Sequence, residues 1–409
     1  MATVPIYVGQ CGNQIGYQFD VERFENQLST SETTRGRTIT RSSNTRSGKA
    51  SDTNYRDSIM IDTESKVINK LAKLHLTKSS GKLRARNPVL EKALESVRRQ
   101  AERCDMFNNI LLISSLCGGT GGGLGSRILE SLRGEFRLEH IISCVVAPFL
   151  TGDTPLQHYN ALLSLASLQK FSDAVLLFKN DMVSSHCHTS SSVEQGTDHT
   201  GISYTHMNRY IASCLAEITT PTDTLTPSSG FGCNLELSEL VRSVCPQPSL
   251  KFLTTNQATR AIDDVKALCN SVIGLTKKES MSTKCHSLSN VAVIRGGSTS
   301  NSVYATLPAM EQRIKKDLRA VSWNPFPVDY WLSSECLAKG KSGNHSFTLV
   351  TNYSNIIPYA EHVWVKAKQM YTEKAYIHWY YKHGLCQDYF EEAFSTVEDI
   401  IHGYTDAVK

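Results

Sequence analysis

Six glycines stand between an apolar run and an amphipathic one, and this spacing is typical of an anion-binding loop. Residues 110–113 have the length and composition of a buried strand. Glycines follow at positions 118, 119, 121, 122, 123 and 125, and apolar residues return at helical spacing at 128, 129 and 132. Because glycine has no side chain, several backbone N–H groups can point at one anion, and the N-terminus of the next helix adds partial positive charge. The pattern predicts a phosphate-binding loop.

The loop fits neither of the two common nucleotide motifs. No Lys-Ser or Lys-Thr pair follows the glycines, which excludes a Walker A loop. Leu124, Ser126 and Ile128 occupy the third positions of the three possible GxGxxG frames, which counts against a dinucleotide fingerprint. No acidic ribose residue stands about 20 positions beyond a glycine fingerprint either. A nicotinamide-dependent oxidoreductase is therefore the least favoured function.

Further polar residues follow other predicted strands. Residues 4–8 form a short strand that runs into GQCGNQIG at 9–16, whose Gln and Asn amides can bond a base, a ribose or a metal-bound water. A strand at 58–61 ends in Asp62-Thr63-Glu64. A carboxylate at the C-terminal end of a strand is well placed to hold Mg²⁺ through water. Both segments therefore predict ligand contacts beside the glycine loop.

Strands and helices alternate through the first half of the chain. Strands at 140–147 and 174–178 are each followed by a helical pattern, and Asn180 stands at the end of the second. This alternation predicts an α/β fold with a doubly wound parallel sheet, in which ligands bind beyond the C-terminal ends of the strands. A helix at 204–218 places Tyr204 and Asn208 on one face, one turn apart.

The second half of the chain is less regular. A helix is expected at 235–244, and polar loops with strands at 291–294 and 346–351 follow it. Helical segments continue from 360 to 381, and a last helix spaces apolar residues from 390 to 401. The predicted division is a nucleotide-binding domain at 1–183, a linking core helix at 184–219, a mixed α/β intermediate domain at 220–359 and a C-terminal helical region at 360–409.

Composition is ordinary for a soluble intracellular protein. The 409 residues are 40% hydrophobic and 20% charged, and a net charge of +4 is too small to indicate nucleic-acid binding. No signal peptide opens the sequence, and the longest apolar run, at 141–150, is too short for a membrane span. The 12 cysteines include no C-x-x-C pair and indicate reduced thiols. His186-Cys187-His188 is expected in a Ser/Thr-rich loop rather than in a metal site, and the Ser/Thr/Arg-rich residues 29–56 are expected to form a surface loop.

Together these segments resemble the tubulin superfamily over almost the whole chain. The resemblance rests on GQCGNQIG, on CGGTGGG at 117–123, on IDTESKVIN at 61–69 and on AYIHWY at 375–380. The features ESKVIN, VIRGG and SWNPFPVDYW, with Gln157 in place of an acidic ribose contact, are most similar to the delta-tubulin branch. The resemblance implies a tubulin-like fold that binds GTP or GDP with Mg²⁺.

The resemblance also assigns roles to individual residues. Asp62 and Glu64 would act near Mg²⁺, with Asp62 holding it through water, and Asp153 and Gln157 would meet the ribose. Asn180 and Asn208 would read the guanine edge, and Tyr204 would stack on the base. The complete set of implied nucleotide contacts is Gln10, Cys11, Gln14, Asp62, Glu64, Ser115, Cys117, Gly118, Gly119, Thr120, Gly121, Gly122, Gly123, Asp153, Gln157, Asn180, Tyr204 and Asn208.

Hydrolysis is expected to need a second subunit. In LELSEL, Glu239 would orient water against the GTP of a neighbouring subunit, which implies at most a weak GTPase completed in trans. A solvated helix charge is the alternative role for Glu239. The interval before residue 90 is shorter than the family's γ-phosphate sensor loop requires, with residues 79–82 as the nearest candidate. Discrimination between GTP and GDP is therefore left open.

The resemblance implies a GTP-binding cytoskeletal protein with a structural role at the centriole, the basal body and the cilium. The alternative is a polymerising GTPase that enters ordinary microtubules. Expected partners are other tubulin subunits and the microtubule or centriole lattice, with no membrane and no nucleic acid beyond the free nucleotide. The expected location is the cytoplasm and its cytoskeleton, at the centrosome or basal body.

Overall fold

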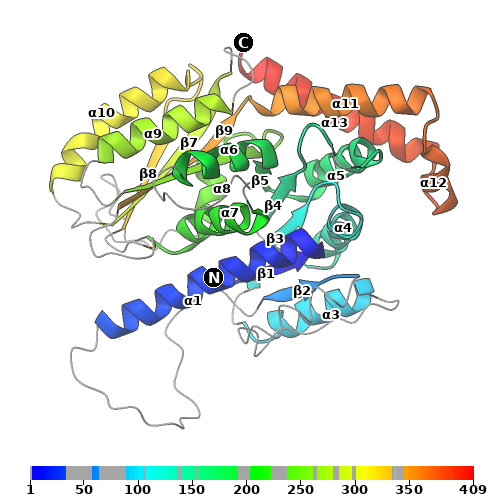
Figure 1. Cartoon of the computed structure of the whole chain (residues 1–409), viewed down its shortest axis with the longest axis horizontal. Coiled ribbons are helices and arrows are strands. Elements are labelled where there is room, and N and C mark those ends of the chain that lie inside the picture. The colour runs from blue at the N-terminus through cyan, green and yellow to red at the C-terminus, as the bar shows by residue number, and fades with distance from the viewer. Residues whose placement is uncertain are drawn as a thin grey trace, which may run out of the picture.

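One mixed sheet runs through the molecule and organises the described helices around it (Figure 1). The computed structural model describes residues 2–33, 58–63, 89–104, 107–136, 138, 140–152, 154–191, 203–222, 237–260, 265–279, 285–296, 301–333, 337 and 345–409. Within these residues nine strands pair in the order β2-β1-β3-β4-β5-β6-β9-β7-β8. The sheet continues without a break across the predicted boundary between the first and second halves, so the domain division stays a prediction.

The first six strands of this order are parallel to one another. They are β2 (Ile59–Ile61), β1 (Ala2–Val8), β3 (Phe107–Ser115), β4 (His140–Ala147), β5 (Ala174–Lys179) and β6 (Phe252–Arg260). The helices between them are α1 (Gly9–Thr33), α3 (Val89–Ala101), α4 (Gly125–Glu135), α5 (Gln157–Phe171), α6 (Asn180–Ser191), α7 (Tyr204–Thr219) and α8 (Leu237–Val244). The predicted parallel, doubly wound sheet is confirmed.

In the second half of the chain the sheet includes antiparallel strand pairs, which the sequence patterns did not indicate. β9 (His345–Tyr353) lies antiparallel to both β6 and β7 (Ser287–Arg295), and β8 (Val328–Ser333) is parallel to β7. The strands predicted at 291–294 and 346–351 form parts of β7 and β9, whereas the helices α9 (Val265–Lys278) and α10 (Asn301–Asp317), which cover this part, were not predicted. β6 was missed because its sequence, FLTTNQATR, is polar although most of the strand is buried.

Helices cover both faces of the sheet, and alternate strand residues meet different helices. In β1, Ile6 and Val8 pack with apolar residues of α3, α4 and α5, while Tyr7 packs on the face covered by α1 and α7. This period of two is the signature of a strand buried on both faces. A third cluster joins α9 and α10 to β7, β8 and β9.

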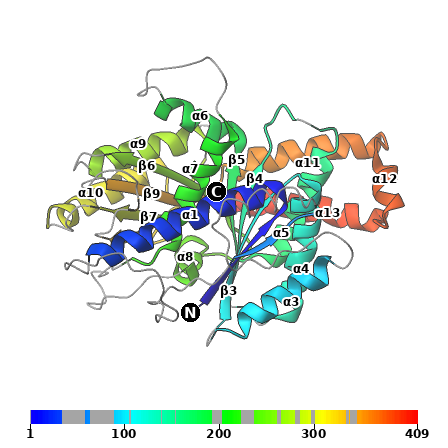
Figure 2. The ribbon, with the colours of Figure 1, turned by 60° about the horizontal axis from the view of Figure 1, so that its bottom comes forward.

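The C-terminal region packs on the same face as α5. It consists of α11 (Ile356–Thr372), the short α12 (Ile377–Lys382) and α13 (Gln387–Ala407). Figures 1 and 2 show α12 at the outer end of α11 and α13, on the side of the molecule away from α9 and α10. The hydroxyl of Tyr404 in α13 accepts a bond from the backbone N–H of Phe252 (2.9 Å) and donates to Asn352 Oδ1 (2.8 Å), which ties α13 to the start of β6. Among the described residues, no helix has the length and apolar content that a membrane crossing requires.

Candidate functional site

The predicted anion-binding loop forms directly after β3. A π-helical turn, η1 (Gly119–Leu124), follows the strand and leads without interruption into α4. The backbone N–H of Leu116 donates to Val146 O (2.9 Å), and that of Gly122 donates to Gly118 O (2.7 Å), so the loop is anchored to β4 and closed on itself. The glycine run therefore lies at the C-terminal edge of the parallel strands, at the N-terminal end of a helix.

The glycines of this loop divide into two classes. A methyl group added to Gly121 would lie 2.8 Å from the backbone nitrogen of Ser115, and one added to Gly122 would lie 2.7 Å from Leu116 O, so both glycines permit the loop to pack on the sheet. A methyl group added to Gly119 or Gly123 would meet nothing within 4 Å. These two exposed glycines leave open space in which an anion can approach the backbone.

The loop after β1 packs directly on the glycine loop. Gly9 has a left-handed backbone (φ 76°), and its Cβ position lies 3.0 Å from Gly121 N, so a side chain here would be strained and crowded. The buried Asn13 donates to Gly9 O and to Ile61 O, both at 2.9 Å. Asn13 thus fixes the first loop to the end of β2, a structural role that its position in a polar motif did not reveal.

The end of β2 completes this edge. Asp62 follows the strand directly and is only 3% exposed, and the hydroxyl of Thr63 lies 2.8 Å from that of Thr120 in the glycine loop. The structure therefore brings the predicted magnesium carboxylate to the same edge as the glycine loop. Its predicted companion Glu64 lies outside the described residues.

Helices α1 and α7 bring two further predicted residues together. Asn208 Nδ2 donates to Gln14 Oε1 at 3.3 Å, across 194 positions of sequence. Tyr204 lies one turn earlier on α7 with 59% of its surface exposed, so its ring is free to stack on a planar ligand. Ser203, the residue before the helix, accepts a bond from the backbone N–H of Thr205 and caps it. Amide and aromatic groups suited to a base therefore stand next to the first loop.

The remaining predicted contacts occupy several environments. Asn180 is the first residue of α6 and is half-buried at the C-terminal end of β5, as expected. Gln10 is exposed at the start of α1, and Ser115 ends β3 beneath Gly118. Burial raises the pKa of the Cys11 and Cys117 thiols to about 12, so both are neutral at physiological pH. Asp153 lies outside the described residues.

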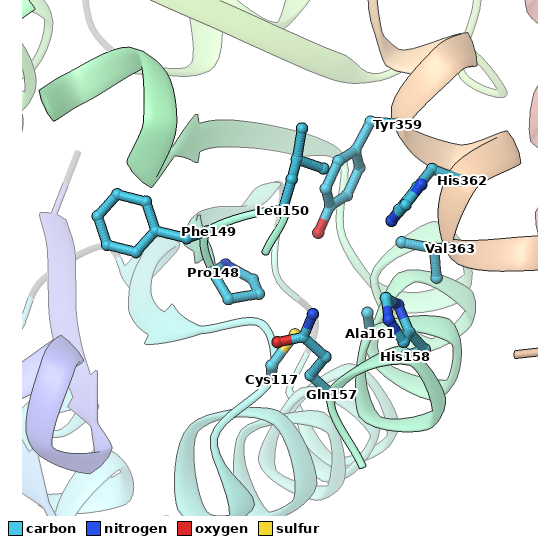
Figure 3. A pocket seen from close by; sticks show the side chains of 10 residues that line it. All are labelled: Cys117, Pro148, Phe149, Leu150, Gln157, His158, Ala161, Tyr359, His362 and Val363. Atoms are coloured by element: carbon cyan, nitrogen blue, oxygen red, sulfur yellow. The ribbon is translucent and has the colours of Figure 1, made fainter. Parts of the chain in front are cut away.

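Gln157 and Cys117 meet in a cavity behind the loop rather than at its open side. Gln157 is 5% exposed, and Figure 3 shows it facing a space that Tyr359 and His362 of α11 close from the other side. The His158 and His362 rings pack edge-to-face with centroids 5.5 Å apart. Sequence patterns missed Tyr359 and His362 because both lie more than two hundred positions from the loop and no local motif marks them.

A second contact from the C-terminal region reaches the loop. Asn160 Nδ2 donates to the carbonyl oxygen of Cys117 (2.9 Å), and the Tyr380 hydroxyl donates to Asn160 Oδ1 (2.7 Å). Tyr380 ends the AYIHWY motif at 375–380, but no sequence pattern gave Tyr380 or Asn160 a role. Their contact shows that this motif packs beside the glycine loop.

Glu239 lies at the opposite edge of the sheet. The C-terminal end of α8 is fixed by Asn352, whose Nδ2 donates to Val244 O (3.0 Å) and to Leu250 O, next to the first residues of β6. Because β3 and β6 run in the same direction, this is the edge where the parallel strands begin, whereas the glycine loop lies where they end. Glu239 is partly exposed and pairs with Arg242 at 2.7 Å.

The His-Cys-His segment requires a correction. It was expected in a loop, but α6 continues to Ser191 and includes it. His186 Nδ1 lies 3.2 Å from the Tyr210 hydroxyl, and burial lowers the pKa of His186 to about 4, so the ring is neutral and packed in the core. No group of three or more metal-binding side chains is found in the part of the chain that the structure describes. The sensor-loop candidate at 79–82 lies outside that part, as does most of the loop at 29–56.

The described residues place several groups suited to a phosphorylated, planar ligand at one edge of the sheet. The glycines with open space offer backbone N–H groups, the Gln14–Asn208 pair offers amides, the exposed Tyr204 ring offers an aromatic face, and Asp62 offers a carboxylate.

Comparison with known proteins points in the same direction. Residues 3–188 match the family model for the Tubulin/FtsZ family, GTPase domain. A tubulin delta chain from Homo sapiens is 24% identical over 475 aligned positions, which cover 99% of both chains. A tubulin epsilon chain from Mus musculus is 25% identical and covers 99% of this chain and 95% of its own length. A tubulin beta chain from Porphyra purpurea is 25% identical but covers 85% of this chain and 73% of its own.

Proposed function

We propose that this chain is a member of the tubulin superfamily and that it binds GTP or GDP between the glycine loop, the first loop and α7, as its similarity to the family's GTPase domain and to tubulin chains supports. The observation that supports this proposal most is the arrangement at one sheet edge. Open space over Gly119 and Gly123 faces the same edge as the Gln14–Asn208 pair. Each charge-assisted N–H bond contributes roughly 1.5–3 kcal/mol, so a few glycine amides suffice to hold a diphosphate or triphosphate without a lysine.

The roles at the site follow from the chemistry of each group. The backbone of residues 117–123, with Ser115 and Thr120, surrounds the phosphates, and Gln10, Cys11 and Gln14 line the neighbouring wall. Asn180 and Asn208 hydrogen-bond the guanine edge, and Tyr204 stacks on the base. Asp62, beside the Thr63–Thr120 hydroxyl pair, would hold Mg²⁺ through water, and the ion would supply positive charge beside the phosphates. Asp153 and Gln157 remain the proposed ribose contacts, and for Gln157 this requires its buried amide to turn out of the cavity.

Hydrolysis belongs to an assembly rather than to one chain. Glu239 stands at the edge where the strands begin, so it cannot reach the glycine loop of its own molecule. In a head-to-tail stack that edge faces the nucleotide edge of the next copy, and Glu239 would orient water there. The Arg242 partner must then release the carboxylate, which favours a weak GTPase.

A structural role in centriole, basal-body and cilium microtubules is our proposal for the cellular function, with other tubulin subunits as partners. It is supported by similarity to delta and epsilon chains along almost their whole length, against partial coverage of a beta chain. The alternative is a polymerising GTPase that enters ordinary microtubules, and the exposed Glu239 is the observation that favours it.

Nucleotide competition tests the proposed ligand. A fluorescent guanine nucleotide is bound to the stripped protein and displaced by GTP or by ATP. We expect ATP to be weaker by on the order of 10²-fold, because adenine leaves the half-buried amides of Asn180 and Asn208 without their proposed partners. Asn208→Ala should reduce the difference in affinity between GTP and ATP. Asn324→Ala removes an amide that bonds Leu288 O near the start of β7, and it should leave this difference unchanged. Equal displacement by ATP and GTP from the wild-type protein would contradict guanine recognition.

A further inference from the structure

The short helix α12 is joined to the glycine loop by two side-chain hydrogen bonds. The Tyr380 hydroxyl donates to Asn160 Oδ1 (2.7 Å), and Asn160 Nδ2 donates to Cys117 O (2.9 Å). Cys117 is the residue immediately before the glycine run. The loop and a helix more than two hundred positions away are thus connected through a single asparagine.

The direction of both bonds is fixed by chemistry. A backbone carbonyl can only accept, so the NH₂ group of Asn160 faces Cys117 and its oxygen faces Tyr380. Tyr380 must therefore donate, and burial raises its pKa, which keeps the proton in place. The Tyr380 ring packs edge-to-face against Tyr159 and Phe390, with centroids 5.5 and 5.4 Å away, so the hydroxyl has one position.

Holding the Cys117 carbonyl also orients the first N–H of the loop. The carbonyl of Cys117 and the N–H of Gly118 belong to one planar trans peptide, in which the two groups point in opposite directions. Asn160 therefore sets the direction of the Gly118 N–H without touching an anion itself. Loss of this bond would let that peptide rotate.

The connection into α12 is strained and exposed. Lys374 and Tyr376 have left-handed backbones (φ 53° and 57°), which residues with side chains adopt only at a cost. The Tyr159 hydroxyl holds this segment by donating to Ala375 O at 3.0 Å. Tyr376 and Trp379 are both nearly half exposed, so α12 presents aromatic surface to solvent. Strained connections of this kind are found where an element has two positions.

We propose that Asn160 and Tyr380 are positioning residues that link occupancy of the glycine loop to the position of α12. An anion in the loop holds the Cys117–Gly118 peptide in the direction that Asn160 recognises, and α12 stays docked. An empty loop frees the peptide, and α12 and its aromatic surface move. The proposal rests on the proposed nucleotide binding. It adds the two residues through which an occupied loop would affect the position of α12.

The dissociation rate of a fluorescent guanine nucleotide tests the link. Tyr380→Phe removes the donor and should speed release about three- to tenfold, the effect of losing one buried hydrogen bond. Tyr330→Phe is the matched control, because it removes a tyrosine hydroxyl that bonds Leu307 O on α10 and leaves the Asn160 bonds intact, and its release should match the wild-type protein. Equal rates for all three proteins overturn the link, and so does equal acceleration in both variants. A wild-type protein that holds no guanine nucleotide overturns the proposed function and the link with it.

Hydrogen exchange of the unaltered protein tests the same link without a substitution. Amides of residues 377–386 should exchange about tenfold more slowly with saturating GTP than after stripping, if α12 is docked by an occupied loop. Amides of residues 400–407, near the tie between Tyr404 and β6, serve as the internal control and should not change. Unchanged exchange at 377–386, in protein shown by chromatography to hold GTP, overturns the link.

Discussion

Glycine does two separate jobs in the loop after β3, and the structure assigns each job to particular residues. Gly121 and Gly122 are buried because the loop must pack against Ser115 and Leu116. Gly119 and Gly123 face open space, so packing does not require a glycine at either position, and we propose that the open space admits a ligand. The glycine spacing alone predicted a phosphate loop but could not separate these two classes.

Gly119→Val is expected to abolish retention of nucleotide while leaving the stripped protein as stable as the wild type. The added side chain meets no protein atom within 4 Å of its Cβ but fills the approach to the backbone N–H groups. Bound nucleotide per protein and the melting temperature of both stripped proteins are measured. Gly134→Val, at an open position on α4, is the control and should keep its nucleotide. Normal nucleotide content in Gly119→Val would refute the assignment of this loop.

Helix α7 connects the site to the second half of the molecule. Its start presents Tyr204 and Asn208 to the candidate site, and its end holds Glu217, whose carboxylate lies 3.1 Å from Nε of Arg295 on β7. Both side chains are almost fully buried, and Arg295 also donates to Glu217 O and Pro221 O. The position of Tyr204 and Asn208, the proposed base contacts, is therefore expected to depend on a buried ion pair at the other end of their helix.

Arg295→Met is expected to lower the free energy of unfolding by about 3–5 kcal/mol, because it leaves the Glu217 carboxylate buried without its cation. Urea unfolding monitored by circular dichroism measures the change. The control is Arg242→Met, which breaks the exposed pair with Glu239 and should cost less than about 1 kcal/mol. Equal effects of the two substitutions would mean that the buried pair does not hold α7 in place.

Glu279, at the end of α9, makes the contact between the two halves sensitive to pH. Burial raises the pKa of Glu279 to about 7, although Lys179 at the end of β5 and a hydrogen bond with Asn256 oppose the shift. A raised pKa means that the folded state prefers the protonated acid. The stabilisation is complete below the ordinary value of 4.5 and is lost as the pH rises through about 7.

Glu279→Gln stays neutral at every pH, so its stability relative to the wild type should rise by up to about 3 kcal/mol between pH 4.5 and pH 8. Urea unfolding at several pH values gives the difference. Glu311→Gln, in an exposed pair with Lys315, shows what removing a surface carboxylate does over the same range. A difference between Glu279→Gln and wild type that is constant with pH would exclude a raised pKa in the folded state.

The elements that sequence predicted well are those with strong apolar periodicity. The strand at 140–147 has the observed bounds of β4, and the helix at 204–218 ends one residue before α7 does. β6 and α10 were missed because one is rich in Thr, Asn and Gln and the other contains Pro308. Buried polar side chains in β6 find partners only in the folded protein, as Asn256 does with the Thr276 hydroxyl (3.2 Å).

The sequence indicated those candidate site residues that stand in motifs. It did not indicate the residues that long-range packing brings beside them. Asp62 and Asn208 reach the expected edge because their strand and helix end or begin there. Gln157 turns inward, and Tyr359 and Tyr380 join the site from the C-terminal helices, which no local spacing could show. Long-range packing decides these contacts, and a single sequence contains no record of it.

At the scale of the whole molecule, the glycine loop and Glu239 lie at opposite edges of one sheet. This polarity allows copies of the chain, or related subunits, to stack with one edge against the other. The two candidate cellular roles differ in whether Glu239 meets a partner in such a stack. The alignments with delta and epsilon chains are longer than this chain, so those relatives carry insertions that it lacks.

GTP turnover measured against protein concentration distinguishes the two roles. The structural role predicts turnover per molecule that stays near zero and does not rise with concentration, because Glu239 is held by Arg242 and meets no polymer partner. A polymerising GTPase predicts a steep rise, which Glu239→Gln should remove. A steep, Glu239-dependent rise would therefore replace the structural role by the alternative.

The nucleotide content of the purified protein tests the central claim most directly. The protein is denatured, the precipitate is removed, and the supernatant is separated by anion-exchange chromatography against GTP, GDP, ATP and NAD standards. We predict close to one guanine nucleotide per chain and negligible adenine nucleotide. A supernatant without guanine nucleotide, from protein that is folded and stays empty when incubated with GTP and Mg²⁺, would contradict it.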